Sequence, residues 1–326
     1  MIGTFTPLHP FFLAPMEAVN CASFRVLCMQ RGASVVYTDM IDADIFTTYA
    51  QEHGTQQALQ KFVNKQPDEV LVIQLGGGNA KNLCFTAQAL QHQAVYIDLN
   101  IGCPLSYMTG KKGGVYLMKH PNILYKIIEQ LRATITIPFT VKIRSGWDEH
   151  HINAIEVACN LEKLGVNAIT LHARTGKQGY KARADWPLVR KVKEQLNIPV
   201  ILSGDVTNAY MAHMAFIHTK CDYIMCGRGA KANPSLFTEL TQYWEHKTQP
   251  QKPLGLYVKT AQQSLSDFKD FLQLYKEREQ RYKLSELIDH ALWQATGAKN
   301  YTVLAQRIRN CQTEHQLLAE MRRMVF

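Results

Sequence analysis

Cys103 lies where a side chain of its type could act as an acid or a nucleophile. It belongs to DLNIGCP, residues 98 to 104, which ends an alternating apolar run, and a glycine- and lysine-rich loop, YMTGKKGG (107 to 114), follows. A thiol with a pKa of about 8.5 keeps its proton at neutral pH and can serve as a general acid. Nearby Lys111 or Lys112 could instead favour the thiolate, which is a nucleophile. We predict a functional thiol, and the pattern alone leaves both roles open.

Two further titratable side chains lie in strand-like apolar runs, Lys142 in FTVKIRSGW and His172 in AITLHAR. A lysine in a buried strand must face a polar cavity or bear a large desolvation penalty, so it needs an anionic partner. A reduced flavin anion would be such a partner, and a carboxylate in a structural salt bridge is the alternative. His172 has the same ambiguity between a site residue and a structural one.

Glycines at the ends of other strand-like runs indicate a ligand site. QLGGGNAK (74 to 81) matches neither G-x-G-x-x-G nor G-x-x-x-x-G-K-[ST], so we exclude these nucleotide motifs and single out Gln74, whose amide can bind a planar heterocycle. SGD (203 to 205) and GRG (227 to 229) let backbone amides approach a ligand closely, and Arg228 adds a fork of donors. They predict a phosphate-bearing cofactor, with ordinary tight turns as the alternative.

These residues need a scaffold, and the β-type runs provide one. The runs occupy residues 11–17, 34–40, 70–77, 94–100, 139–146, 168–174, 199–206 and 223–230. They are almost continuously apolar, as parallel strands buried on both faces are, and amphipathic segments such as NILYKIIEQLR (122 to 132) separate them. We therefore predict an α/β fold, a (β/α)8 TIM barrel with its active site at the carboxyl ends of the strands. A doubly wound open sheet, which needs fewer strands, is the alternative.

A second domain is expected after the barrel. The polar segment EHKTQPQKP follows FTELTQYW (237 to 244), and residues 255–326 carry apolar residues at three- and four-residue steps. This predicts a barrel over residues 1–243 and a small all-α helical bundle over 244–326. In that bundle Tyr275, Arg278 and Tyr282 could share a face suited to RNA, or that face could simply be solvated.

Composition excludes several classes of protein. The 326 residues are 46% hydrophobic and 19% charged, and no run approaches a membrane span, so we expect a cytoplasmic protein without a membrane partner. Eight cysteines without metal-ligand spacing predict reduced thiols and no metal. The net charge of +9 is typical of a protein with a polyanionic partner. We expect a monomer rather than an obligate oligomer.

Together these motifs resemble the tRNA-dihydrouridine synthase family, FMN enzymes that reduce a uridine of tRNA to 5,6-dihydrouridine. The segments that carry the resemblance span nearly the whole barrel: LAPMEAV, QLGG, DLNIGCP, VKIRSGW, LHARTGKQGY followed by ADW, IPVILSGDV and CGRGA. DLNIGCP combined with HARTGKQGY is the specific part, because other FMN barrels do not share both.

The resemblance implies FMN as cofactor, NADPH as reductant and tRNA as partner. The residues that would contact the flavin ring come from several motifs: Ala14, Pro15, Met16, Gln74, Lys142 and His172. The residues that would hold the ribityl chain and phosphate follow the last two strands: Ser203, Gly204, Asp205, Gly227 and Arg228. Asn100 would face the uracil, hydride would pass from the flavin to C6, and Cys103 would donate a proton to C5. The helical domain would recognise tRNA.

The chain departs from the family pattern at two places. Ser203 stands where the family usually has asparagine, and LSYMT precedes Lys111 where the family typically has an earlier basic residue. Two other functions remain open at this point. One is an FMN reductase of free pyrimidines resembling dihydroorotate dehydrogenases, and the other is a tRNA-binding protein that keeps FMN with little turnover.

Overall fold

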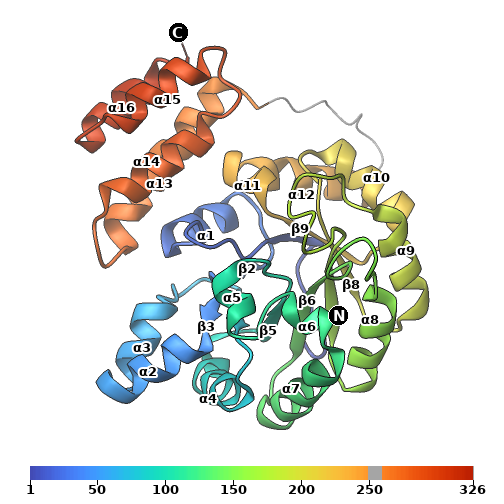
Figure 1. The fold of residues 1–326 in the computed structure, drawn as a ribbon. Helices are drawn as coiled ribbons and strands as arrows, with labels where there is room; N and C mark the ends of the chain where they lie inside the picture. The colour runs from blue at the N-terminus through green and yellow to red at the C-terminus, as the bar shows by residue number, and fades with distance from the viewer. Residues whose placement is uncertain (249–258, 326) are drawn as a thin grey trace.

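The N-terminal part of the chain folds into a barrel of parallel strands (Figure 1) in the computed structural model, which describes residues 1–248 and 259–325. Its strands are β1 (Phe11–Leu13), β2 (Val36–Tyr37), β3 (Ile41–Asp42), β4 (Leu71–Gly76), β5 (Tyr96–Ile101), β6 (Phe139–Arg144), β7 (Ala168–His172), β8 (Val200–Ser203) and β9 (Tyr223–Cys226). Their order is β1-β9-β8-β7-β6-β5-β4-β2, and a bridge from Phe12 to Val35 closes the ring. The predicted TIM barrel is confirmed, and the open-sheet alternative is wrong.

The second predicted strand, residues 34–40, forms only β2; β3 lies just beyond that range, and both strands pair with β4. Asp39, between them, accepts hydrogen bonds from the backbone N–H groups of Ala18 (3.1 Å) and Asn20 (3.0 Å). Asp42 then caps the next helix by accepting from Asp44 and Ile45. The strand ends early because its polar residues bind the neighbouring loop and helix instead of extending the sheet.

Apolar side chains fill the interior of the barrel below the site. This inner cluster comprises Ile2, Phe12, Ala14, Val35, Tyr37, Val72, Tyr96, Ala168, Ile201 and Met225. The hydroxyls of Tyr37 and Tyr96 meet at 2.9 Å, so these buried phenols satisfy each other. With the interior packed in this way, a ligand can enter the barrel from its carboxyl end.

Helices surround the sheet because their apolar stripes need cover. In α7, Leu124, Ile127, Ile128 and Leu131 are buried at helical spacing, as the pattern predicted. The helices of this part are α1 (Ala22–Gln30), α2 (Ala43–His53), α3 (Thr55–Phe62), α4 (Ala80–Leu90), the 3-10 helix η1 (Gln91–Gln93), α5 (Ser106–Gly110), α6 (Tyr116–Lys119), α7 (Pro121–Thr134), α8 (Ala154–Lys163), α9 (Trp186–Gln195), α10 (Ala209–Thr219), α11 (Arg228–Ala232) and α12 (Leu236–Thr248).

The C-terminal helices are α13 (Ala261–Arg278), α14 (Leu284–Gln294), α15 (Tyr301–Arg309) and α16 (Glu314–Arg322). The boundary expected at 243/244 falls inside α12, whose Trp244 packs edge-on against Phe11 of β1 at 6.2 Å. The expected linker after Thr248 lies outside the described residues. Among the helices that are described, none has both the length and the apolar character to span a bilayer.

Tyr275, Arg278 and Tyr282 do not share one exposed helix face, although the rings of Tyr275 and Tyr282 meet edge to face at 6.2 Å. Tyr275 is 1% exposed and donates to Glu286 at 2.7 Å, and α13 ends at Arg278, before Tyr282. Arg278 turns back to the barrel and donates to Gln66 at 3.1 Å. Both the RNA-stacking interpretation and the solvated-face interpretation are therefore wrong for Tyr275, because its ring is part of the core.

The C-terminal helices dock on the barrel through α1, which lies against α13 (Figure 1). Asp267 is fully buried and accepts from Arg31 Nε and from Ser235 Oγ, each at 2.8 Å. Glu279 accepts from the backbone N–H (2.8 Å) and hydroxyl (2.7 Å) of Ser23 in the first turn of α1. A carboxylate from the helical part thus caps a helix of the barrel, where negative charge is favourable.

Asp267→Ala should lower the free energy of unfolding by about 3 kcal/mol, because it leaves the guanidinium of Arg31 and the hydroxyl of Ser235 without their buried partner. Asp270 also pairs with Arg31 but is 45% exposed, so Asp270→Ala is the matched control, with an expected loss below about 1 kcal/mol. Denaturant unfolding measures both. Equal losses in the two variants would show that burial of Asp267 does not hold the domains together.

Candidate active site

Two adjoining cavities of about 360 Å³ and 570 Å³ lie at the carboxyl ends of the strands. They have several lining residues in common: Pro15, Met16, Lys142, His172, Tyr180 and Arg228. The first cavity adds Gln74, Asn100 and Cys103. The predicted residues found in the second alone are Ala14, Ser203, Gly204, Asp205 and Gly227. The fold thus brings every side chain predicted for the site to this one region.

Cys103 is held by a turn at the end of β5. Asn100 Oδ1 accepts from the backbone N–H of Gly102 (3.0 Å) and of Cys103 (2.8 Å), a local turn that asparagine favours. The carbonyl of Cys103 accepts from Val115 N at 3.0 Å, and a Cβ at Gly114 (φ +57°) would lie 2.4 Å from that oxygen. The loop therefore needs glycine where it returns to Cys103.

The thiol of Cys103 is protonated at neutral pH. Burial raises its pKa most and Glu17 adds to the rise, against the opposing effects of the backbone N–H of Leu105, of Arg144 and of Lys142. Lys111 instead donates to Asp42, the N-cap residue of α2, at 2.7 Å, so its charge is paired away from the thiol. The sequence-based interpretation in which Lys111 favours a thiolate is wrong.

Lys142 and His172 face the site from neighbouring strands, and burial shifts the pKa of both. Lys142 pairs in register with Asn100, and burial, followed by Arg144, lowers its pKa to about 8. Within residues 1–248 and 259–325 its ammonium group has neither a hydrogen bond nor an ion pair. The pKa of His172 is lowered far below its ordinary value, first by burial and then by neighbouring cations, so the imidazole is neutral. Its Nε2 lies 3.2 Å from a donor nitrogen of Arg174, which leaves the proton on Nδ1.

Gln74 and Asn100 meet directly at the first cavity, and Gln74 also binds a buried residue that the sequence pattern did not single out, Asp98. Gln74 is fully buried, donates to Asp98 at 2.7 Å and accepts from Asn100 at 2.9 Å. Burial raises the pKa of Asp98 to about 6, although hydrogen bonds from Thr140 and Gln74 oppose the rise. An aspartate within an apolar strand was the available signal.

The second cavity lies between the ends of β8 and β9. Gly204 has φ +137°, and a Cβ there would lie 2.9 Å from Ala184, so glycine is required. Asp205 accepts from Arg174 at 2.6 Å and lies 3.5 Å from Arg228, so its carboxylate positions two cations beside the cavity. This fold frequently binds phosphate at this place.

Sequence reasoning missed two residues that shape the mouth of the site, Arg144 and Tyr180. Arg144 donates to the carbonyls of Gly102 (2.7 Å) and Thr175 (2.9 Å), which joins the Cys103 loop to the loop after β7. Tyr180 is 58% exposed, and the guanidinium of Arg228 lies 4.8 Å from its ring centre. A second cation two positions after Lys142 was the sequence signal for Arg144.

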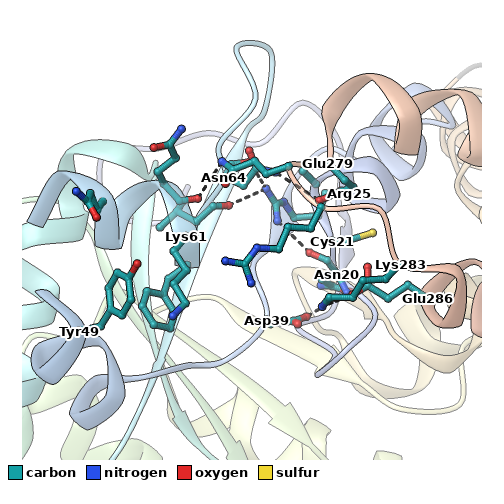
Figure 2. Close-up of a pocket in the computed structure, with 17 residues that line it drawn as sticks. Asn20, Cys21, Arg25, Asp39, Tyr49, Lys61, Asn64, Glu279, Lys283 and Glu286 are labelled. Atoms are coloured by element: carbon teal, nitrogen blue, oxygen red, sulfur yellow. Dashed lines mark hydrogen bonds and ion pairs between the residues drawn. The ribbon is translucent and has the colours of Figure 1, made fainter. Parts of the chain in front are cut away.

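A third cavity, of about 600 Å³, lies between the barrel and the helical part. Figure 2 shows Tyr49 and Lys61 on one side and Glu279, Lys283 and Glu286 on the other. Arg281 also lines it. The walls of this interdomain cavity and of the first cavity come in part from the same two segments, because Asn20 and Asp39 line the former and their neighbours Val19 and Met40 line the latter.

The described residues contain no group of three or more His, Cys, Asp or Glu that could hold a metal. All eight cysteines are free thiols, and Cys221, Cys226, Cys28 and Cys311 are buried.

Comparison with known proteins identifies the family. The family model described as dihydrouridine synthase matches residues 12–325. The chain is 32% identical over 237 residues to tRNA-dihydrouridine synthase B of Pasteurella multocida, which covers 72% of this chain and 70% of that protein. It is 31% identical over 255 residues to the protein of the same name from Vibrio vulnificus, with 78% of each covered.

Solved structures agree on the fold. The 6-hydroxypseudooxynicotine amine oxidase of Pseudomonas geniculata aligns with a TM-score of 0.58 at 11% identity, over 84% of this chain and 51% of that one. At 11% identity this similarity shows a shared fold and nothing about function. The family match, by contrast, spans nearly the whole sequence and includes both halves of the site. The chain therefore belongs to the dihydrouridine synthase family of oxidoreductases.

Proposed function

We propose that this protein reduces the C5=C6 bond of a uridine in tRNA, with FMN as cofactor, NADPH as reductant and Cys103 as the proton donor. The observation that carries the proposal is the meeting of a protonated thiol, Cys103, with Lys142 and His172 around one cavity that continues into a second, cation-lined one. Membership of the dihydrouridine synthase family supports it.

The residues present fit FMN. The unpaired ammonium of Lys142 suits the anionic edge of a flavin ring, beside Pro15 and Met16, which line both cavities. Arg228 and the glycine-bearing turns at 203–205 and 227–229 suit a phosphate. Ser203 lies in the first of these turns, so its hydroxyl can contact the cofactor where the family usually has the amide of an asparagine. Reduced FMN supplies a hydride to C6 of the uracil when it is bound.

The chemistry left to the chain is a proton transfer. The hydride brings two electrons to C6, and the Cys103 thiol gives its proton to C5, which completes the saturated bond and leaves a thiolate that regains a proton from water. Burial favours the neutral thiol, which supports the acid over the nucleophile for Cys103. The neutral imidazole of His172 adds a donor, Nδ1–H, without a competing charge.

The helical part supports tRNA as the substrate. Lys61 of α3 and Lys283 from the helical part line the interdomain cavity (Figure 2), and Arg281 lines it as well. The relatives named above are tRNA-dihydrouridine synthases. We therefore assign FMN binding to the barrel and tRNA recognition to helices α13 to α16. Extrusion of the uridine from the tRNA would bring its base to Cys103.

Cys103→Ala should reduce the rate of dihydrouridine formation by about 100-fold or more, the usual contribution of a general acid, while FMN binding persists. The assay uses tRNA from cells that lack the protein, with dihydrouridine measured by mass spectrometry and flavin by absorbance. Cys159→Ala, on α8, is the control thiol. Full activity in the Cys103 variant would disprove the acid role, and absence of dihydrouridine with the wild type would disprove the function.

Arg228→Ala should weaken FMN binding by about tenfold to 100-fold, because it removes a charge-assisted contact to the phosphate. Arg190 pairs with Glu194 on the exposed side of α9, so Arg190→Ala controls for loss of positive charge. Titration of the flavin-free protein with FMN measures both affinities. Equal affinities in the two variants would place the phosphate elsewhere.

Lys142→Met should stabilise the flavin-free protein near neutral pH, by about 2 kcal/mol, because it removes a buried charge without a partner. Burial, with Arg144, lowers the pKa of Lys142 from 10.5 to about 8 in the folded state. Between those values the unfolded state binds more protons, so the wild type gains stability as the pH rises. The advantage of methionine should therefore disappear by the upper end of that window in unfolding experiments across pH. An advantage that does not change with pH would contradict the assignment.

A further inference from the structure

A buried chain of hydrogen bonds runs from Asp98 to the loop that carries Cys103. Gln74 Nε2 donates to Asp98 Oδ2 at 2.7 Å, and Asn100 Nδ2 donates to Gln74 Oε1 at 2.9 Å. The chain ends at Asn100 Oδ1, which accepts from the backbone N–H of Gly102 and of Cys103. Asp98 and Gln74 are both 0% exposed, so water cannot substitute for a lost partner within the barrel.

The two ends of this chain have a fixed hydrogen-bonding character. The carboxylate of Asp98 only accepts, whereas the backbone N–H groups of Gly102 and Cys103 only donate. Each amide between them has one donating and one accepting end, so one orientation of Gln74 and one of Asn100 satisfies every neighbour. Reversal of either amide would bring two donors or two acceptors together in a buried place, which is unfavourable.

This polarity determines what Asn100 offers to a substrate. Its Oδ1 already accepts two hydrogen bonds, and one Nδ2 hydrogen goes to Gln74. The group left for the cavity beside Cys103 is the second Nδ2 hydrogen, a donor. A donor pairs with a carbonyl oxygen of a uracil ring and is mismatched to the amino group that cytosine carries in place of O4.

We propose that Asp98 is a positioning residue: its accepting oxygen fixes the orientation of Gln74, which fixes Asn100, so that Asn100 presents a donor to the base and holds the Cys103 turn. The inference rests on the proposed uridine reduction for its substrate, while the orientation of the turn concerns the free protein. Asp98 acts through two amides and contacts neither base nor cofactor in this scheme.

Two variants of Asp98 separate its accepting oxygen from its charge. Asp98→Leu removes the acceptor and keeps the branched shape and the number of side-chain heavy atoms. Asp98→Asn keeps it, because the asparagine Oδ1 can face Gln74 while its Nδ2 faces the hydroxyl oxygen of Thr140, which now contacts Asp98 at 2.6 Å. Asp98→Ala replaces the leucine variant if leucine prevents folding. Flavin absorbance of each full-length protein establishes that it is folded and loaded.

The first measurement is hydrogen exchange of the peptide that contains Gly102 and Cys103, in the free protein. We expect faster exchange in the leucine variant, since Asn100 no longer holds these N–H groups, and protection near wild type in the asparagine variant. The second is reduction of dihydrouridine-free tRNA at saturating concentration. In this assay the Asp98→Leu variant should be slower by about tenfold or more with an unchanged Kd for tRNA. The Asp98→Asn variant should retain most of the wild-type rate.

Three outcomes would overturn the proposal. Equal impairment of the leucine and asparagine variants would mean that the charge matters and not the acceptor. Unchanged exchange and rate in the leucine variant would mean that Asn100 is oriented without Asp98. A large loss in the asparagine variant alone would contradict the orientation described for Thr140. If the wild type reduces no uridine, the proposed function fails, and the exchange measurement still tests whether Asp98 orders the turn.

Discussion

The hydrogen bonds between β1 and residues 34–35 close the sheet into a barrel, and the arrangement of the site depends on that closure. Ser34 N donates to the carbonyl of Phe11 at 3.0 Å, and Leu13 N donates to the carbonyl of Val35 at 2.9 Å. Since all strands are parallel, their carboxyl ends then form one ring. Met16, after the first strand, comes to line the same cavities as Arg228, after the last. The packed interior beneath leaves this end open to a ligand.

Burial at that end determines the charge of the reactive groups. Removal from water disfavours a charged form, so it raises the pKa of the Cys103 thiol and lowers the pKa of His172 and of Lys142. One physical cause thus yields a thiol that retains its proton, a neutral imidazole and an ammonium group that lacks a partner. A proton donor beside an unpaired cation is suited to the saturation of a double bond near an anionic cofactor.

Much of the fold could be predicted because its signals are local. The apolar runs located every barrel strand except the short β3, and Leu124 to Leu131 gave the buried face of α7 at the expected spacing. The early end of the second strand could not be predicted, because it depends on Asp39 binding Ala18 and Asn20, a contact between segments distant in sequence. The burial of Tyr275 against Glu286 likewise depends on how two helices pack.

Part of the active site could also be predicted, because some of its signals are local in the sequence. Cys103, Lys142 and Arg228 stand out because a reactive or charged side chain at the end of an apolar strand is unusual in sequence. The partners that give them their properties do not stand out. Asp98 acquires its importance only when Gln74 from the neighbouring strand meets it, and Arg144 only when it spans two loops. Residue types in the sequence therefore predict where a reactive group lies, and tertiary contacts decide its protonation, its orientation and its partners.

The same contacts connect the active site to the helical part. Asp39 holds the loop at Ala18 and Asn20, which leads into α1, and Glu279 caps the first turn of α1 from the far side. Arg31, after the other end of α1, is held by Asp267. Helix α1 is thus fixed at both ends by carboxylates of the helical part, and the loop before it carries Met16 into the active site. A displacement of α13 would therefore have to break buried ion pairs or move the wall of the cavity. Under the proposed function, a tRNA bound by the helices would therefore meet the Cys103 loop at an angle that the docking of α13 on α1 helps to set.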